Sequence, residues 1–516
     1  MGARSTGIAG QTLVRQTLIN GRLVLKIMMN HQWRRSAGAL VCLCTMTPIG
    51  LASPPAQTPA PADQASQVSA PAIAETRLTL QSAVDRAVAN YPTVRIALQR
   101  LLAAKESVGL TRTQYLPQAN VLWQTNRSTY NNIPGLLLPQ GVIPVLSGTV
   151  LANTSNTSVW GSAGGLLMNW EPTRFGYRKA EVAAAQAGSN AAGDRLALTK
   201  LDMSSAAASA YLTVATLHEQ VKSAQADLSR RKTFAKTIHV LVDSQLRPGA
   251  DASAADAEVA ASRTRLIQAQ TQEKVSLAAL AELLVLPSSQ ITLNSDSLLV
   301  ADASTDVPAF AAASHPLALE QGHLLDQTKS VEHVWSRAYA PRFSLEGAVS
   351  GRGSGVKPDG TLLGGVNGLA PDRENWAIGI QATFAPFDYF SIREQKRIAA
   401  SNVQAQKLNY QNTIEALNTQ VEQARIELDG ARQIAQNTPV ELTSARMAEL
   451  QARARYQAGL ANIVEVTQAQ ALLQQAESDD AAAHIAVWQA LLNVCAAQGD
   501  LTPFLNQLPG QSAGGH

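Results

Sequence analysis

Four short segments of the chain alternate between apolar and polar side chains, a pattern that predicts β-strands with two different faces. They cover residues 118–130, 158–171, 342–352 and 374–387. The last segment shows the pattern most clearly, because Trp376, Ile378 and Ile380 alternate with Ala377 and Gly379. A half-buried strand of a soluble sheet gives the same alternation. Strands of about ten residues, however, also match the length of a tilted membrane-spanning strand.

The apolar sets of these segments are predicted to face lipid, and the polar sets to face water. The predicted lipid-facing residues are Val121, Trp123, Phe343, Leu345, Trp376, Ile378 and Ile380. Four strands cannot close into a barrel, and an open sheet edge in lipid is prohibitively costly. Three copies of the chain would supply twelve strands, enough for a transmembrane β-barrel with an aqueous lumen. Residues 131–157 and 356–372 are then expected to form external loops.

Two very long helices are predicted, over residues 177–245 and 391–456, because Ala- and Gln-rich sequence continues through both ranges. At 1.5 Å per residue, the first helix would be roughly 100 Å long. Each long helix is followed by a turn and a return helix, over residues 250–283 and 461–497. A glycine in each turn is expected to provide the left-handed backbone conformation that ends the long helix.

The chain carries this succession of elements twice, which indicates an internal duplication. A helical stretch runs from Pro92 to Pro117 and another from Pro316 to Pro341, and both intervals are twenty-five residues. Each stretch is followed by two alternating segments and a helical hairpin, so the fold is expected to be mainly α-helical with a shared β-barrel. The predicted limits are 77–285 for the first repeat, 286–313 for a linker, 314–500 for the second repeat and 501–516 for a C-terminal tail.

The first part of the chain has the pattern of an export signal. A basic segment at residues 29–35 precedes an apolar run at residues 37–51, as in a signal peptide. Residues 1–52 are therefore predicted to be an N-terminal extension and signal peptide, and the Pro- and Ala-rich residues 53–76 a disordered linker. Only Cys495 would remain after cleavage, so no internal disulfide is expected. The translation start is left open between Met1, Met28 and Met29.

Composition and charge exclude several classes of function. The formal net charge of +3, without a dense Lys/Arg cluster, argues against a nucleic-acid partner. His315, His323 and His333 lie eight and ten residues apart, a spacing that does not bring them together as metal ligands on a helix. No apolar run of eighteen residues follows residue 51, so no membrane-spanning helix is expected. Without any catalytic or phosphate-binding motif, we expect no enzyme activity, metal or cofactor.

The combination of these features is similar to the TolC-type outer-membrane factors. The resemblance covers about residues 77–500. Its motifs are Tyr115-Leu116-Pro117, Trp170-Glu171-Pro172, Phe384-Ala385-Pro386-Phe387-Asp388, Arg455-Tyr456-Gln457-Ala458-Gly459-Leu460 and Gln468-Ala469-Gln470. The resemblance implies a homotrimer in the cell outer membrane, with a β-barrel in the lipid and an α-helical tunnel in the periplasm. It also implies that residues 286–313 and the segment after about residue 498 form a girdle around the middle of the tunnel.

The resemblance implies sites near the ends of the helical hairpins. The residues that would face a periplasmic adaptor are Gly249, Ala250, Ala458, Gly459, Leu460 and Ala461. Val464, Gln468 and Ala471 would line the periplasmic aperture. Many relatives carry Asp and Arg at the last two of these positions, so a salt-bridge lock is not expected here. Asp256 and Glu465 would either supply acidic rings or belong to a solvated helix surface.

The leading hypothesis is a passive exit duct of a tripartite efflux pump for drugs or other small molecules. Its partners would be two identical subunits, a periplasmic adaptor, outer-membrane lipid and an inner-membrane pump of RND or ABC type. The exit component of a type I protein secretion system would have the same fold, and the sequence does not separate the two functions. A soluble periplasmic coiled-coil scaffold without a pore is the alternative from a different class.

Overall fold

The structure is a computed structural model that describes residues 76–130, 155–293, 298–299, 310–357 and 359–508. All of these residues belong to one unit, Pro71–His516. The predicted signal peptide, almost all of the predicted linker and most of the first predicted external loop lie outside the described residues. The last eight residues of the predicted C-terminal tail also lie outside them.

Each half of the chain contains two strands between helices, in the predicted order. The first half contains α1 (Leu80–Asn90), α2 (Pro92–Thr113), β2 (Gln118–Thr129), β3 (Ser158–Thr173), α3 (Tyr177–Asp243) and α4 (Gly249–Leu284). The second half contains α5 (Pro316–Arg337), β5 (Arg342–Ser354), β6 (Arg373–Thr383), α6 (Asp388–Gln457) and α7 (Ile463–Gln498). This order confirms the prediction of a mainly helical fold built from a duplicated unit.

Proline marks the start of the helix that precedes the strands in each half. Pro92 and Pro316 occupy the first turn of α2 and α5, where a backbone N–H would have no partner within the helix. The preceding residues, Tyr91 and His315, have extended backbone, as is usual before proline. His315 also caps α5, because its Nδ1 accepts the N–H of Leu317 at 3.1 Å. Local chemistry therefore accounts for both starts.

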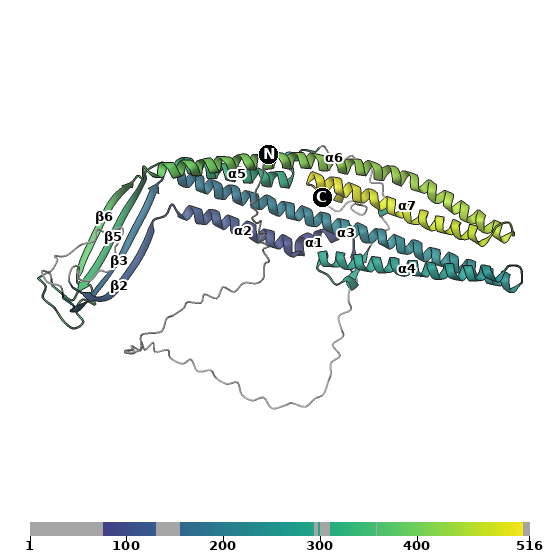
Figure 1. Cartoon of the computed structure of the whole chain (residues 1–516), viewed down its shortest axis with the longest axis horizontal. Helices are drawn as coiled ribbons and strands as arrows, with labels where there is room; N and C mark the ends of the chain where they lie inside the picture. Colours follow the sequence, from purple (N-terminus) through teal and green to yellow (C-terminus); the bar gives the residue numbers. More distant parts are fainter. Residues whose placement is uncertain (1–75, 131–154, 294–297, 300–309, 358, 509–516) are drawn as a thin grey trace, which may run out of the picture. The chain divides into compact units, whose positions relative to one another are not determined.

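The four longer strands form one antiparallel sheet in the order β2–β3–β5–β6. Pairing of β3 with β5 joins the two halves of the chain, and β2 and β6 remain as edge strands. Because α2 and α5 lead into strands and α3 and α6 follow strands, all four helices meet the sheet at the same end. Figure 1 shows the sheet at this end of the helices and the two hairpin turns at the other.

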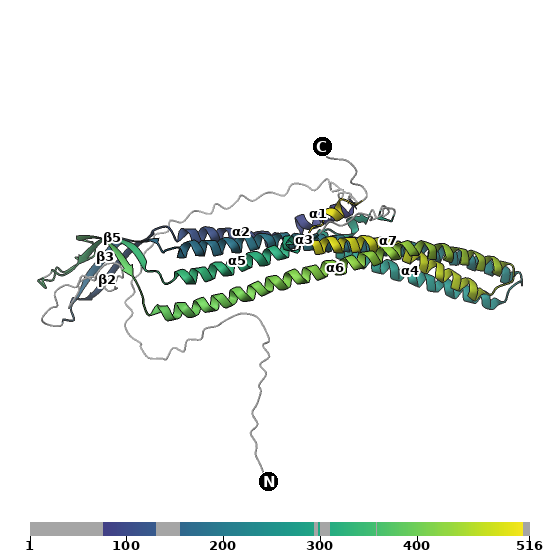
Figure 2. The same ribbon diagram turned by 90° about the horizontal axis from the view of Figure 1, so that it is seen from above.

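The long helices α3 and α6 organise the rest of the fold. α3 packs against α2, α4, α5 and α7, whereas α6 packs against α5 and α7. The helices next to the sheet therefore follow the order α2–α3–α5–α6. Pro439 lies inside α6, where it removes one backbone donor and favours a bend, and Figure 2 shows α6 on a curved path. Within the described ranges, no helix is both long and apolar enough to cross a membrane.

The largest apolar core lies around the middle of α3 and the C-terminal part of α7. The short elements are β1 (Thr76–Leu78), η1 (Ser288–Gln290), β4 (Ile291–Leu293), η3 (Ala312–Ser314) and α8 (Thr502–Leu505). Tyr211 Oη donates to Leu78 O at 3.0 Å, and Trp488 Nε1 donates to Leu298 O at 3.0 Å. Both rings are buried, and the Phe504 ring contacts Trp488 edge to face. These contacts hold β1, the segment at Leu298 and α8 against α3 and α7.

Candidate functional site

The pairing register of the sheet brings the predicted lipid-facing residues onto one face. One row across the four strands consists of Val121, Leu166, Val349 and Trp376. Residues directly opposite each other in antiparallel strands point to the same face, and alternate residues of each strand extend it. By this register, all seven predicted residues share that face: Val121, Trp123, Phe343, Leu345, Trp376, Ile378 and Ile380.

The described part of the chain leaves this apolar face uncovered. Val121 is 83% exposed, Trp376 78% and Ile380 79%. Contiguous apolar patches that stay exposed usually mark an interaction with protein or membrane. Leu166 and Met168 belong to the same face, but sequence analysis missed them because the glycines of β3 obscure its alternation. Only their pairing partners on β2 and β5 identify the face to which they belong.

The opposite face of the sheet is mainly polar or small. One of its rows consists of Gln124, Ala163, Arg352 and Arg373. A second row, closer to the helices, consists of Gln118, Asn169, Glu346 and Gly379. The sheet therefore separates an apolar side from a side that suits water, as the alternation of the four segments taken together predicted.

Both helical hairpins turn in the same way. In the first turn the N–H of Leu246 bonds to the carbonyl five residues earlier at 2.9 Å, and in the second the N–H of Leu460 does so at 2.8 Å. This is the bond of a Schellman helix end, which places the preceding residue in the left-handed conformation. That residue is Gln245 (φ 61°) in the first turn and Gly459 (φ 79°) in the second.

The expectation that Gly249 ends the first long helix is therefore wrong. Gly249 is the first residue of α4, and the hydrogen bonds make Leu246 the counterpart of Leu460. These leucines are 69% and 71% exposed. Sequence analysis missed Leu246 because it used glycine as the marker of the turn. The other residues assigned to adaptor docking also lie at or beside the turns: Ala250, Ala458, Gly459 and Ala461.

Tyr456 connects the two turns. Its ring is buried, and its hydroxyl donates to Asp251 Oδ2 at 2.9 Å, across from α6 to α4. Its backbone carbonyl accepts from Arg247 Nη2 at 2.6 Å, and the Arg247 guanidinium lies over the ring. Burial and the hydrogen bond to Asp251 raise the pKa of Tyr456 to about 12, so the phenol remains a donor throughout the physiological range. The tip of one hairpin is thus bonded to the tip of the other.

Replacing Tyr456 with Phe is expected to loosen this connection while keeping the ring in place. The lost hydrogen bond to a charged group corresponds to about 1.5–3 kcal/mol. Hydrogen exchange of the backbone amides at both turns should therefore become faster. Tyr410→Phe serves as the control, because the Tyr410 hydroxyl has no hydrogen bond among the described residues. Equal exchange in the wild type and the Tyr456 variant would show that the bond does not connect the turns.

The aperture candidates lie on one exposed side of α7. Val464, Gln468 and Ala471 are spaced by four and three residues and are exposed, whereas the intervening Val466 and Gln470 are buried. Spacings of four and three place residues on the same face of a helix. Among the described residues, this side of α7, formed by Val464, Gln468 and Ala471, is therefore left exposed.

The two acidic candidates have partners within their own hairpins. Asp256 on α4 contacts His239 Nε2 on α3 at 3.0 Å, a hydrogen bond that raises the pKa of His239. Glu465 Oε2 lies 3.4 Å from Arg455 Nη1 across the second turn, and the backbone N–H of Glu465 donates to Asn462 Oδ1. These contacts are typical of a charged, solvated helix surface.

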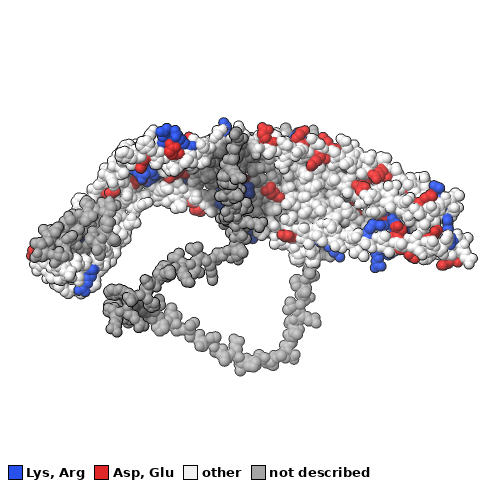
Figure 3. Space-filling view, in the orientation of Figure 1, with Lys and Arg blue, Asp and Glu red and all other residues white. Residues whose placement is uncertain are grey.

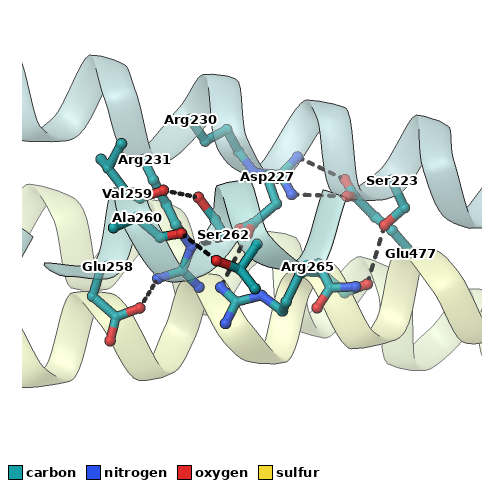
Figure 4. A network of polar contacts seen from close by, with 12 residues as sticks. Ser223, Asp227, Arg230, Arg231, Glu258, Val259, Ala260, Ser262, Arg265 and Glu477 are labelled. Atoms are coloured by element: carbon teal, nitrogen blue, oxygen red, sulfur yellow. Dashed lines mark hydrogen bonds and ion pairs between the residues drawn. The ribbon is translucent and has the colours of Figure 1, made fainter. Parts of the chain in front are cut away.

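A network of charged side chains, with Asp227 and Arg231 buried at its centre, joins the two hairpins farther from the turns (Figure 4). Arg231 Nε contacts both carboxylate oxygens of Asp227 at 3.0 and 2.9 Å, and its Nη1 donates to Glu258 on α4 at 2.6 Å. Arg230 makes two bonds to Glu477 on α7, at 3.1 and 2.9 Å. The network thus fixes α3 to both α4 and α7. In the described part of the chain, no group of His, Cys, Asp and Glu side chains is arranged to hold a metal ion.

Comparison with known families identifies the class of the protein. The sequence matches the outer membrane efflux protein family over residues 83–284 and 337–500, well over half of the chain. The chain therefore belongs to this family. No curated protein sequence gives a significant match. Membership confirms the predicted resemblance to TolC-type factors, since this is the family of outer-membrane efflux channels.

Solved structures show the same fold. A membrane protein from Pseudomonas aeruginosa is 19% identical, with a TM-score of 0.66 over 82% of this chain and 90% of that one. The outer membrane protein VceC from Vibrio cholerae is 17% identical, with a TM-score of 0.65 over 82% and 96%. The open state of the MtrE channel from Neisseria gonorrhoeae is 18% identical, with a TM-score of 0.65 over 82% and 89%.

Family and fold together establish the general function and the location. The protein is an outer-membrane efflux channel with a large periplasmic helical part, and it is not an enzyme. The sheet and the helical hairpins described above are the two parts from which its transport path has to be built.

Proposed function

We propose that three copies of the chain form a closed twelve-stranded barrel in the outer membrane. The observation that carries this proposal is a four-stranded sheet with one uncovered apolar face and with β2 and β6 as edge strands. In lipid, unpaired N–H and C=O groups of an edge have no water to bond, so the edges of neighbouring copies have to pair. The apolar face then contacts lipid, and the polar face lines an aqueous lumen.

The helices support the same assembly. α2 and α6 lie at the two sides of the helical order α2–α3–α5–α6, so each has a side without a main packing partner. Both carry exposed apolar residues, including Ile96, Leu102 and Leu110 on α2 and Ile398 and Leu408 on α6. Contact between α6 of one copy and α2 of the next would bury these side chains. It would also continue the barrel as a helical tunnel in the periplasm.

This tunnel acts as the passive exit duct of a tripartite efflux pump for drugs or other small molecules. The periplasmic adaptor docks on the hairpin turns, and an inner-membrane pump of RND or ABC type supplies the energy. The docking residues are Gly249, Ala250, Ala458, Gly459, Leu460 and Ala461, joined by Leu246. Val464, Gln468 and Ala471 line the aperture between the hairpins. The exposed leucine at each turn supports this assignment, because apolar anchors dominate the affinity of protein interfaces.

Replacing Leu460 with Asp tests the docking assignment. Adaptor affinity is expected to fall about thirtyfold, which corresponds to the roughly 2 kcal/mol carried by an interface anchor. Replacing Gly459 with Val should also lower the adaptor affinity, because a β-branched residue is strained at φ 79°. Asn437→Asp, an exposed position of α6 away from the turns, is the charge-matched control. Adaptor binding by purified trimers is the measurement, and undiminished binding and drug export by the Leu460 variant would contradict the assignment.

A further inference from the structure

Two arginines lie directly opposite each other on the polar face of the sheet. Arg352 of β5 is paired with Arg373 of β6, in the row that continues through Ala163 and Gln124. The Cβ atoms of directly opposed residues in antiparallel strands are about 5 Å apart, and like charges at such positions destabilise the sheet. The fold therefore keeps an electrostatically unfavourable pair at this position, which requires a reason.

The nearest acidic residues do not neutralise the pair. Asp372 donates its N–H to Arg352 O at 3.0 Å, but among the described residues its carboxylate forms no ion pair with either arginine. Glu374 follows Arg373 directly, so the alternation of the strand directs it to the apolar face. Both guanidinium groups are therefore available to a solute on the polar face.

The remaining carboxylates near this end do not pair with the arginines either: Asp359, in the loop between β5 and β6, accepts the N–H of Thr361 at 2.9 Å and forms no ion pair with them among the described residues. Among the paired positions of the described strands, the acidic residue on the polar face is Glu346. It lies six residues from Arg352 along β5, about 20 Å at 3.3 Å per residue. That distance exceeds the Debye length of about 8 Å at physiological ionic strength. The first predicted loop also offers no acidic residue, since residues 131–154 contain no Asp or Glu.

The surroundings of the pair suit an anionic group. In the adjacent row of the polar face, Ser350 lies opposite Asn375, and both side chains can donate hydrogen bonds. A guanidinium group binds a carboxylate or phosphate through two parallel hydrogen bonds. The pair lies where β5 ends at Ser354 and β6 begins, at the end of the sheet away from the helices. Figure 3 shows basic side chains near this end of the sheet.

We propose that Arg352 and Arg373 select anionic solutes, such as organic carboxylates and phosphates, as they leave the channel. The inference rests on the proposed trimer, in which three copies bring six guanidinium groups into one ring near the outer mouth of the lumen. Rings of basic side chains favour anions in pores, and low-dielectric walls concentrate their field on the passing solute. The ring lowers the energy of an anion in the lumen, and an anion bound there offsets the repulsion between the paired arginines.

Ion selectivity of the purified trimer in planar lipid bilayers tests this inference. Under a KCl gradient, the reversal potential of the wild type is expected to lie between zero and the chloride equilibrium potential. In the double variant Arg352→Gln and Arg373→Gln, the reversal potential should shift toward the potassium equilibrium potential, with loss of the anion preference. The variant with Lys at both positions keeps the charge and should keep the preference. Arg127→Gln is the control, because Arg127 lies on the apolar face with its guanidinium over the Trp160 ring. This substitution should leave the reversal potential unchanged.

The outcomes separate this inference from the proposed function. The role of the arginines would be overturned if the conducting wild-type channel preferred potassium. It would also be overturned if the two Gln substitutions left the reversal potential unchanged. Neither outcome would contradict the proposed function as a channel. Absence of conductance in the wild type would contradict the proposed function and this inference with it. The preference should also weaken in about 1 M salt, where the Debye length is only about 3 Å.

Discussion

Lysine in place of Ile378 is expected to abolish assembly in the outer membrane, whereas lysine in place of the adjacent Ala377 is expected to leave it intact. The two residues are neighbours in the middle of β6 and point to opposite faces of the sheet. A lysine on the lipid-facing side near the bilayer midplane costs about 2–4 kcal/mol in each copy. Three copies multiply this cost, whereas the same lysine on the polar face remains in water.

Cell fractionation and gels of unheated samples provide the measurement. The Ala377 variant should reach the outer-membrane fraction and run as a trimer, and the Ile378 variant should be degraded or recovered as unassembled chain. Trp376→Lys, on the same face but closer to the end of the strand, is expected to have a weaker effect, because the cost falls toward the interface. Equal insertion of the Ile378 and Ala377 variants would mean that the apolar face does not contact lipid.

Methionine in place of Arg231 is expected to destabilise the helical part by about 3–5 kcal/mol, the usual result of breaking a buried ion pair on one side. Asp227 is 1% exposed and Arg231 3%. Without Arg231, the ion pair left to the Asp227 carboxylate among the described residues would be the one with Arg265, at 3.5 Å and with the arginine side chain 43% exposed. A buried carboxylate without a close partner has a large desolvation penalty. Thermal unfolding of the helical signal in detergent is the measurement.

Two further variants distinguish the buried charge from a loss of packing. Replacing Asp227 with Leu and Arg231 with Met together removes both charges, and stability should return close to that of the wild type. Arg397→Met breaks the exposed pair with Glu394, for which a loss below about 1 kcal/mol is expected. If the double variant were as unstable as the single one, side-chain packing rather than an unpaired charge would explain the effect.

Local patterns predicted most of the fold, because its elements are signalled by short-range chemistry. Pro92 and Pro316 start helices for reasons contained in the helix itself, and β6 alternates cleanly because each face meets one kind of environment. The face of β3 was not predictable in this way. A Cβ at Gly164 would lie 2.5 Å from the Trp123 ring, so glycine is required there by a neighbour on another strand. Only the register reveals that requirement.

The sites were less predictable because they depend on contacts between distant segments. Gln245 takes the left-handed position that sequence reasoning assigned to glycine, since the Schellman hydrogen bonds of the turn, and not its composition, fix that position. Asp227 and Arg231, four residues apart, look in sequence like an ordinary surface pair. Their burial follows from α4 and α7 packing over them, at separations that no local pattern reports.

Counting the subunits of the protein extracted from outer membranes tests the central claim most directly. Native mass spectrometry of the detergent-solubilised protein should give three times the mass of the denatured chain, because four strands per copy can close a barrel only with partners. A single chain that stays monomeric and dissolves without detergent would contradict the barrel, the tunnel and every site assigned to them.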